Sequence, residues 1–308
     1  MIYTCTIAPS IDYTVYLPEF AAGKLNRADS VFYYPGGKGI NVSRVLKRLG
    51  SDSKALGFAG GFTGQWIEQF LKDEGIASDF IPTDETTRIN VKIKSKEETE
   101  LNGPGPEPDA DQLGLLTAKV KAMEKGDWFV LAGSLPETMP DTIFSELSSI
   151  CEAQGIRLVL DTSGPALKKL VESRPFLIKP NLEELGELFG KELTGREQAY
   201  ECALELVKKG VGHVIVSMGS EGALLVTEHN AYSAKAPIGK VVNTVGSGDS
   251  LVAGFIASFS QYQDVQKAFR CGVACGSATA FRSDLCEKAG VEALLEQVEI
   301  SQFDGQDV

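Results

Sequence analysis

The segment at residues 242–255, VNTVGSGDSLVAGF, places two glycines and an aspartate directly before an apolar run with helical spacing. Gly246 and Gly248 flank Ser247, and Asp249 follows at once. The first turn of a helix presents unpaired N–H groups and the positive end of the helix dipole, which together attract an anion. Glycine lets an anion approach this backbone because it has no Cβ. The segment therefore favours a phosphate-facing loop in which Asp249 accepts a proton from an attacking hydroxyl.

This loop matches neither of the common nucleotide motifs. The chain contains no G-x-x-x-x-G-K-[ST] sequence, and Leu251 stands where a dinucleotide fingerprint has its third glycine. A simpler interpretation stays open, in which Asp249 only occupies a helix first turn, where acidic residues are favourable.

A second glycine-rich helix entry lies at residues 34–50, YPGGKGINVSRVLKRLG. Its apolar residues follow helical spacing, and the glycines at 36, 37 and 39 precede them. Lys38 lies inside this turn and Asn41 at the helix start, where both side chains can donate to a polyol or a phosphate. The alternative is an ordinary tight turn between a strand and a helix, with a solvated lysine.

A third segment, residues 177–190 (LIKPNLEELGELFG), ends a strand and begins a helix. Lys179 and Asn181 stand at the strand end, and two glutamates open the helix. One interpretation is that Glu184 orients a hydrated Mg²⁺, an ion that is held by few carboxylates and keeps several waters. The other is that the glutamates only complement the helix dipole.

The elements that must position these residues alternate along the chain. Short apolar runs such as DWFVLAGS and IRLVLDTS alternate with amphipathic stretches, which predicts a mainly parallel sheet with helices on both faces. We expect residues 1–308 to form a single domain. Residues 11–34 and 79–102 interrupt the rhythm with polar, strand-like alternation, RINVKIKS being a clear example. They predict a small projecting β-sheet that covers a site or forms a dimer contact.

Composition narrows the partners and the location. The net charge of −12 argues against nucleic acid or an anionic membrane as a partner, since both favour a basic face. The six cysteines are scattered, form no Cys-x-x-Cys pair and have only two histidines beside them, so we expect buried thiols rather than a zinc site. No membrane-length apolar run and no signal peptide is present, which predicts a cytoplasmic protein.

Taken together, PGGKGINVSRVL, LAGSLPE, FLIKPNLEELGELFG and NTVGSGDSLVAGF resemble the ribokinase-like (PfkB-type) carbohydrate kinases, and the likeness covers essentially the whole chain. The resemblance implies a three-layer α/β/α fold with a β-sheet lid, ATP and Mg²⁺ as cofactors, and a homodimer that forms through the lid. Within the family the sequence is most similar to kinases of phosphorylated ketohexoses. The kinases that it resembles most act on fructose 1-phosphate, and those that it resembles next act on tagatose 6-phosphate.

The resemblance also implies a role for individual residues. Asp249 matches the catalytic base, and the anion hole matches Gly246, Ser247 and Gly248. Asp12 matches an acid that holds sugar hydroxyls, with help from Gly37 and Asn41. The family positions that line the sugar-phosphate side of the site correspond to Lys24, Lys38, Arg88 and Ser134. The family positions that bind the nucleotide and Mg²⁺ correspond to Lys179, Asn181, Glu184, Ser217, Gly219 and Gly222. Gly248 belongs both to this group and to the anion hole. Two of these keep a simpler interpretation, Lys24 as a solvated loop lysine and Ser134 as a turn residue.

The expected reaction is the ATP-dependent phosphorylation of D-fructose 1-phosphate to fructose 1,6-bisphosphate. Kinases of tagatose 6-phosphate or fructose 6-phosphate are the nearest alternatives, with the same chemistry. A non-catalytic sugar or nucleotide sensor on the same fold is the alternative from another class, which Asp249 and its two glycines disfavour. A dehydrogenase is disfavoured by the missing dinucleotide fingerprint.

Overall fold

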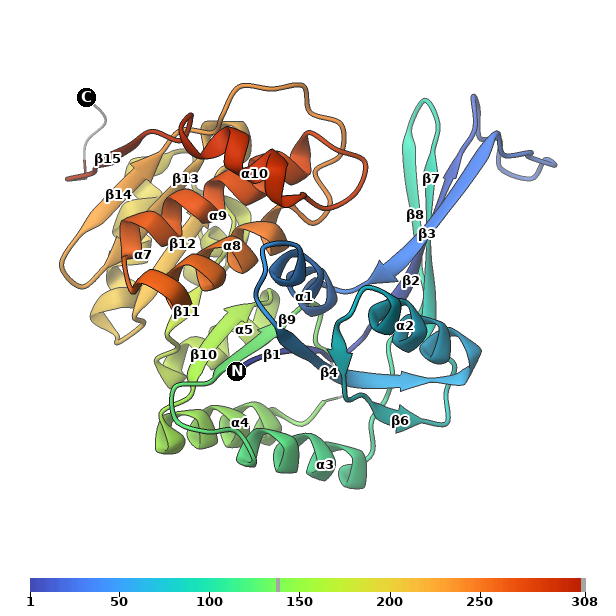
Figure 1. The fold of residues 1–308 in the computed structure, drawn as a ribbon, viewed down its shortest axis with the longest axis horizontal. Helices are drawn as coiled ribbons and strands as arrows, with labels where there is room; N and C mark the ends of the chain where they lie inside the picture. Colours follow the sequence, from blue (N-terminus) through green and yellow to red (C-terminus); the bar gives the residue numbers. More distant parts are fainter. Residues whose placement is uncertain (137–138, 306–308) are drawn as a thin grey trace.

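The computed structural model describes residues 1–136 and 139–305. Its main sheet is parallel around the central strand β1 (Ile2–Thr6) (Figure 1). The other parallel strands are β4 (Ser53–Gly60), β5 (Ala77–Ser78), β6 (Ile81–Thr83), β9 (Trp128–Ala132), β10 (Arg157–Asp161), β11 (Leu177–Ile178) and β12 (His213–Ser217). Beyond β12 the edge is antiparallel and consists of β13 (Ala223–Thr227), β14 (Ala231–Ala234) and β15 (Ile300–Gln302).

Helices cover both faces of this sheet, as the alternation predicted. One layer contains α3 (Ala110–Lys121), α4 (Asp141–Gln154), α5 (Gly164–Leu170), α6 (Leu182–Phe189) and α7 (Arg196–Lys208). The other contains α1 (Lys38–Arg48), α2 (Gly61–Asp73), α8 (Ser247–Tyr262), α9 (Val265–Ala280) and α10 (Lys288–Leu295). The predicted three-layer α/β/α architecture is therefore confirmed. Across the described residues, no helix combines the length and apolar character that a membrane crossing requires.

A separate four-stranded sheet projects from this body (Figure 1). It has the order β3-β2-β7-β8 and is formed by β2 (Ser10–Tyr16), β3 (Ser30–Gly36), β7 (Arg88–Lys94) and β8 (Glu98–Asn102). We call it the lid sheet. The stretch 79–102 is divided between the two sheets, because β6 pairs with β4 of the main sheet. The alternation in RINVKIKS separates an apolar face from a polar face of β7.

Thr6, at the carboxyl end of β1, holds the start of α1. Its Oγ1 accepts a hydrogen bond from the Ile40 N–H at 3.1 Å. A Cβ on Gly39 would lie 2.6 Å from that Oγ1, and one on Gly37 would lie 2.5 Å from the Thr6 methyl group. The glycines thus let α1 begin directly against the strand, which brings its first turn to the carboxyl edge of the sheet, where ligands bind in open α/β folds.

Candidate active site

A cavity of about 400 Å³ lies where the carboxyl ends of the parallel strands meet the lid sheet. Both glycine-rich helix entries and the segment after β11 open into it. The structure brings most of the predicted site residues to this cavity, namely Asp12, Gly37, Lys38, Asn41, Arg88, Ser134, Lys179, Asn181, Glu184, Ser217, Gly246, Gly248 and Asp249. Three segments that are far apart in the sequence therefore meet in one place.

The glycine loop before α8 has the form of an anion site. Gly246 is the N-cap in a left-handed conformation with φ of 80°, and no side chain in the described chain caps the helix. The Ser247 hydroxyl is buried without a hydrogen-bond partner. A Cβ on Gly248 would lie 2.9 Å from Lys179 Nζ, so this glycine lets the lysine approach the helix start. The positive end of the helix dipole, an unpartnered hydroxyl and a nearby cation together suit a phosphate.

Asp249 lies in the first turn of α8 and is only 6% exposed. Its Oδ2 accepts a hydrogen bond from Asn41 Nδ2 at 2.8 Å, which links α8 to α1. Burial raises the pKa of Asp249 to about 6, and the negative charge of Asp161 adds to this; Asn41 and two lysines oppose it. A carboxylate with this pKa still ionises at neutral pH and is a stronger base than an ordinary aspartate.

The sequence interpretation missed Asp161, which ends β10 inside the core. Its Oδ1 lies 3.0 Å from Lys38 Nζ and 3.4 Å from Lys179 Nζ. Burial acts to raise the pKa of Asp161, but the two lysines outweigh it and lower that pKa. The available signal was an acid at the end of an apolar strand, in LVLDTS.

Lys38 and Lys179 are fixed cations rather than solvated ones. Burial acts to lower the pKa of Lys38, but the charges of Asp161, Asp249 and Glu184 raise it. Both ammonium groups are held beside the glycine loop by Asp161. The simpler interpretation of Lys38, a solvated lysine in a turn, does not describe this structure.

Asp12 comes from the lid sheet. Its Oδ1 accepts hydrogen bonds from Ser10 Oγ at 2.8 Å and from Asn90 Nδ2 at 3.2 Å. Gly36 is required beside it, since a Cβ there would lie 2.4 Å from Asp12 Oδ1. Sequence reasoning had assigned no role to Ser10 or Asn90. Together these donors orient one carboxylate oxygen.

Arg88 lies at the base of β7 and is anchored to the backbone. Its terminal nitrogens donate to the carbonyls of Ala8 at 3.0 Å and Gly103 at 3.3 Å, and its Nε is buried without a partner. Burial lowers the pKa of Arg88, and Asp12 partly offsets that effect. Ser134 follows β9 and lines the same cavity. Both residues thus line the same cavity as Asp12.

Lys24 does not line this cavity. It is exposed on the loop between β2 and β3. Since β2 has seven residues, this loop begins roughly 20 Å beyond the base of the lid sheet. Within one chain, Lys24 is therefore a solvated loop lysine.

Glu184 and Asn181 form a capping box at the start of α6. Asn181 Oδ1 accepts from the Glu184 N–H at 2.7 Å, and Glu184 Oε2 accepts from the Asn181 N–H at 2.9 Å. Glu184 Oε1 lies 4.0 Å from Lys38 Nζ. The described residues contain no group of three or more His, Cys, Asp or Glu side chains that would hold a metal by themselves. One carboxylate beside a phosphate site fits Mg²⁺, which is bound mainly by water and substrate oxygens.

The two glycines after β12 do not line the cavity, although Ser217 does. Gly222 has a structural reason, because a Cβ there would lie 1.9 Å from the Ala234 carbonyl oxygen. Gly219 has a positive φ of 59° in the same short turn.

The sequence interpretation also missed an apolar segment before the glycine loop, in which Ile238 is 97% exposed and Val241 and Val242 are more than half exposed.

Comparison with known proteins agrees with this geometry. The family model described as pfkB family carbohydrate kinase matches residues 4–289. The chain belongs to this family. A 1-phosphofructokinase of Bacillus subtilis (strain 168) is 47% identical, over 98% of this chain and 100% of that protein.

Two further members of the PfkB family extend the comparison. A D-tagatose-1-phosphate kinase of Bacillus licheniformis is 37% identical, over 98% of this chain and 100% of that protein. The crystal structure of phosphofructokinase-2 from Escherichia coli in complex with fructose-6-phosphate superimposes with a TM-score of 0.90 at 32% identity, covering 96% of this chain and 98% of that one. The fold and the family are thus shared along nearly the full length.

The pH dependence of the PfkB-type reaction tests the state of Asp249. A general base must be unprotonated to act, so if Asp249 is that base, kcat/KM falls below about pH 6, the pKa to which burial raises this carboxyl group. The phosphate of a sugar substrate titrates in the same range, so the Asn41→Ala variant serves as the control. Loss of the Asn41 hydrogen bond should move the acid limb to higher pH. A limb that stays in place would belong to the substrate.

Proposed function

We propose that this PfkB-family kinase transfers the γ-phosphoryl group of ATP to D-fructose 1-phosphate and forms fructose 1,6-bisphosphate. The observation that carries the proposal is the pairing, in one cavity, of a buried carboxylate of raised pKa with an uncapped, glycine-rich helix start. The similarity to a 1-phosphofructokinase at 47% identity supports this choice of substrate.

In the proposed reaction, Asp249 accepts the proton of the sugar 6-hydroxyl as that oxygen attacks the γ-phosphorus. The new O–P bond forms while the bond to the β–γ bridging oxygen breaks, and ADP leaves. Asn41 holds the base by its 2.8 Å hydrogen bond. The N–H groups at the start of α8 receive charge from the transferred group, as donors in an oxyanion hole do.

The lysines supply fixed positive charge for the phosphates. Lys38 and Lys179 are both held on Asp161, at 3.0 and 3.4 Å, so they need no reordering when ATP enters. Glu184 would hold Mg²⁺ through water, and the bound ion would neutralise charge on the phosphates. The apolar segment with Ile238 and Val242 offers a surface for the adenine ring.

The sugar would lie between the lid sheet and α1, where Asp12 and Asn41 face the same cavity. Arg88 and Ser134 are the candidates for the substrate's own phosphate, since guanidinium groups bind phosphate oxygens by paired hydrogen bonds. The similarity to a D-tagatose-1-phosphate kinase makes tagatose phosphates the second substrate candidate.

The outer face of the lid sheet supports a homodimer. Val31, Tyr33, Ile89 and Leu101 are between 42% and 58% exposed on that face. Their strands belong to one sheet, in which β2 lies between β3 and β7, and Tyr13 of β2 stands opposite both Tyr33 and Val91, so β2 links the apolar side chains across this face. Such a patch on a sheet favours burial against a second copy.

The substrate choice is tested by ADP release, in a coupled assay across fructose 1-phosphate, fructose 6-phosphate, tagatose 6-phosphate, tagatose 1-phosphate and free fructose. We expect the highest kcat/KM with fructose 1-phosphate. Asp249→Asn should lower kcat by about 10²–10⁴, the contribution of a positioned general base, and leave ATP affinity unchanged.

Each alternative has its own result in this assay. A higher kcat/KM with another sugar phosphate would replace the substrate. An Asp249→Asn variant that keeps more than a third of the wild-type kcat would remove Asp249 from the mechanism. Absence of any sugar-dependent ADP release would favour a sensor without catalysis.

The dimer is tested by light scattering at micromolar concentration, where the mass should be twice the 33.1 kDa of one chain. Leu101→Asp buries a charge in the proposed interface and should give the monomer. Leu115→Asp is the control, because Leu115 is 51% exposed on α3, outside the lid sheet. A wild-type monomer, or equal behaviour of the two variants, would count against the lid interface.

A further inference from the structure

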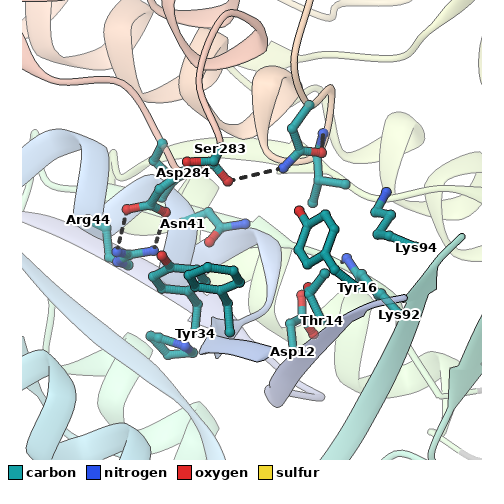
Figure 2. Close-up of a pocket in the computed structure, with 15 residues that line it drawn as sticks. Asp12, Thr14, Tyr16, Tyr34, Asn41, Arg44, Lys92, Lys94, Ser283 and Asp284 are labelled. Carbon is teal, nitrogen blue, oxygen red and sulfur yellow. Dashed lines mark hydrogen bonds and ion pairs between the residues drawn. The ribbon is translucent and has the colours of Figure 1, made fainter. Parts of the chain in front are cut away.

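A second cavity, of about 120 Å³, lies beside the catalytic one and shares Asp12, Asn41 and Val245 with it (Figure 2). Its wall combines the inner face of the lid sheet with α1 and the loop after α9. Asp12 therefore stands between the two cavities. One of its oxygens is oriented by Ser10 and Asn90, and the other faces a lysine.

That lysine is Lys92. Its Nζ lies 3.4 Å from Asp12 Oδ2, and its side chain is only 12% exposed. Strand pairing explains the contact, because β2 and β7 run parallel with Asp12 opposite Asn90 and Thr14 opposite Lys92. Side chains two residues apart point to the same face of a strand. The polar alternation of RINVKIKS thus brings Lys92 to the carboxylate of Asp12.

Lys94 supplies the comparison within the same strand. It also lines the second cavity, one alternation further out (Figure 2). Its ammonium group pairs with Glu98, which lies directly opposite on β8. The two lysines on one face of β7 thus differ in their partners. Lys92 contacts Asp12, the candidate ligand of the sugar hydroxyls, whereas Lys94 contacts Glu98 at the surface.

We propose that Lys92 is a positioning residue for the sugar, acting through Asp12; this rests on the proposed function. Ser10 and Asn90 fix one oxygen of the carboxylate, and Lys92 fixes the other. An ionised carboxylate is only an acceptor, so the lone pairs that remain free are directed at the sugar hydroxyls. Charge-assisted contacts hold such a geometry more firmly than neutral ones. A sugar held in this way keeps its 6-hydroxyl aligned with Asp249.

The test compares Lys92→Met with Lys94→Met, using the sugar phosphate on which the wild type has its highest kcat/KM. We expect Lys92→Met to lower kcat/KM about 10²-fold, with effects on both kcat and the KM for the sugar, because a small misplacement of the reacting hydroxyl has this size of effect. The KM for ATP and the thermal unfolding midpoint should not change. Lys94→Met should stay within about twofold of wild type, as an exposed ion pair contributes little. Lys92→Arg should recover part of the loss.

Asp12→Asn completes a double-mutant cycle. If Lys92 acts through Asp12, the Lys92→Met effect should shrink to less than about threefold in the Asp12→Asn background, since coupled residues are not additive. Free fructose gives a second reading, because a residue that positions hydroxyls should matter as much for the free sugar as for the phosphosugar.

Three results would overturn the inference while leaving the proposed function in place, and the first two concern the kinetics. One is an additive cycle, and the other is a loss confined to the phosphosugar, which would make Lys92 a direct phosphate ligand. A fall in the unfolding midpoint of Lys92→Met with unchanged kinetics would make it a structural residue. A wild-type enzyme that phosphorylates none of the sugars would overturn the proposed function and the inference together.

Discussion

Asp161 places one buried negative charge between two lysines that come from different parts of the chain. Lys38 belongs to the first turn of α1 and Lys179 follows β11, and both lie within 3.4 Å of the same carboxylate oxygen. A buried charge without a partner is strongly destabilising, so this group requires its lysines as much as it holds them. The same negative charge raises the pKa of Asp249. One core carboxylate thereby holds the two lysines beside the cavity and adds to the effect of burial on the pKa of Asp249.

The fold makes this arrangement possible because parallel strands end at one edge. Asp161 ends β10, Lys179 follows β11, and Thr6 at the end of β1 receives the first turn of α1. Glycines at the two helix entries allow backbone and side chains to approach within contact distance. Although the chain has a net charge of −12, its cavity is lined by Lys38, Lys179 and Arg88, which under the proposed function would meet the phosphates of ATP and of the sugar.

The sequence predicted the layers and the three segments of the site, because glycine-rich helix entries and hydrophobic periodicity are local signals. It missed Asp161, whose lysine partner at position 38 is 123 residues away, so that only the folded sheet brings them together. The predicted place of Lys24 beside the sugar phosphate is not found within one chain, for a related reason. The length and direction of β2 decide how far the loop with Lys24 lies from the cavity. Gly222 shows the opposite case, a glycine required by packing against Ala234 rather than by a ligand. Lys92 received no role from the sequence, because the alternation does not show which side of the lid sheet meets the body.

The most direct test of this account is a titration of Asp249 itself. Infrared difference spectra between the wild type and Asp249→Asn, recorded across pH without ligands, isolate the carboxylic acid band of this one side chain. We expect the band to appear with a midpoint near pH 6, because burial and the charge of Asp161 raise the pKa of Asp249 to about 6. A midpoint at the ordinary aspartate value of 3.8 would show that burial and the charge of Asp161 do not raise the pKa of Asp249.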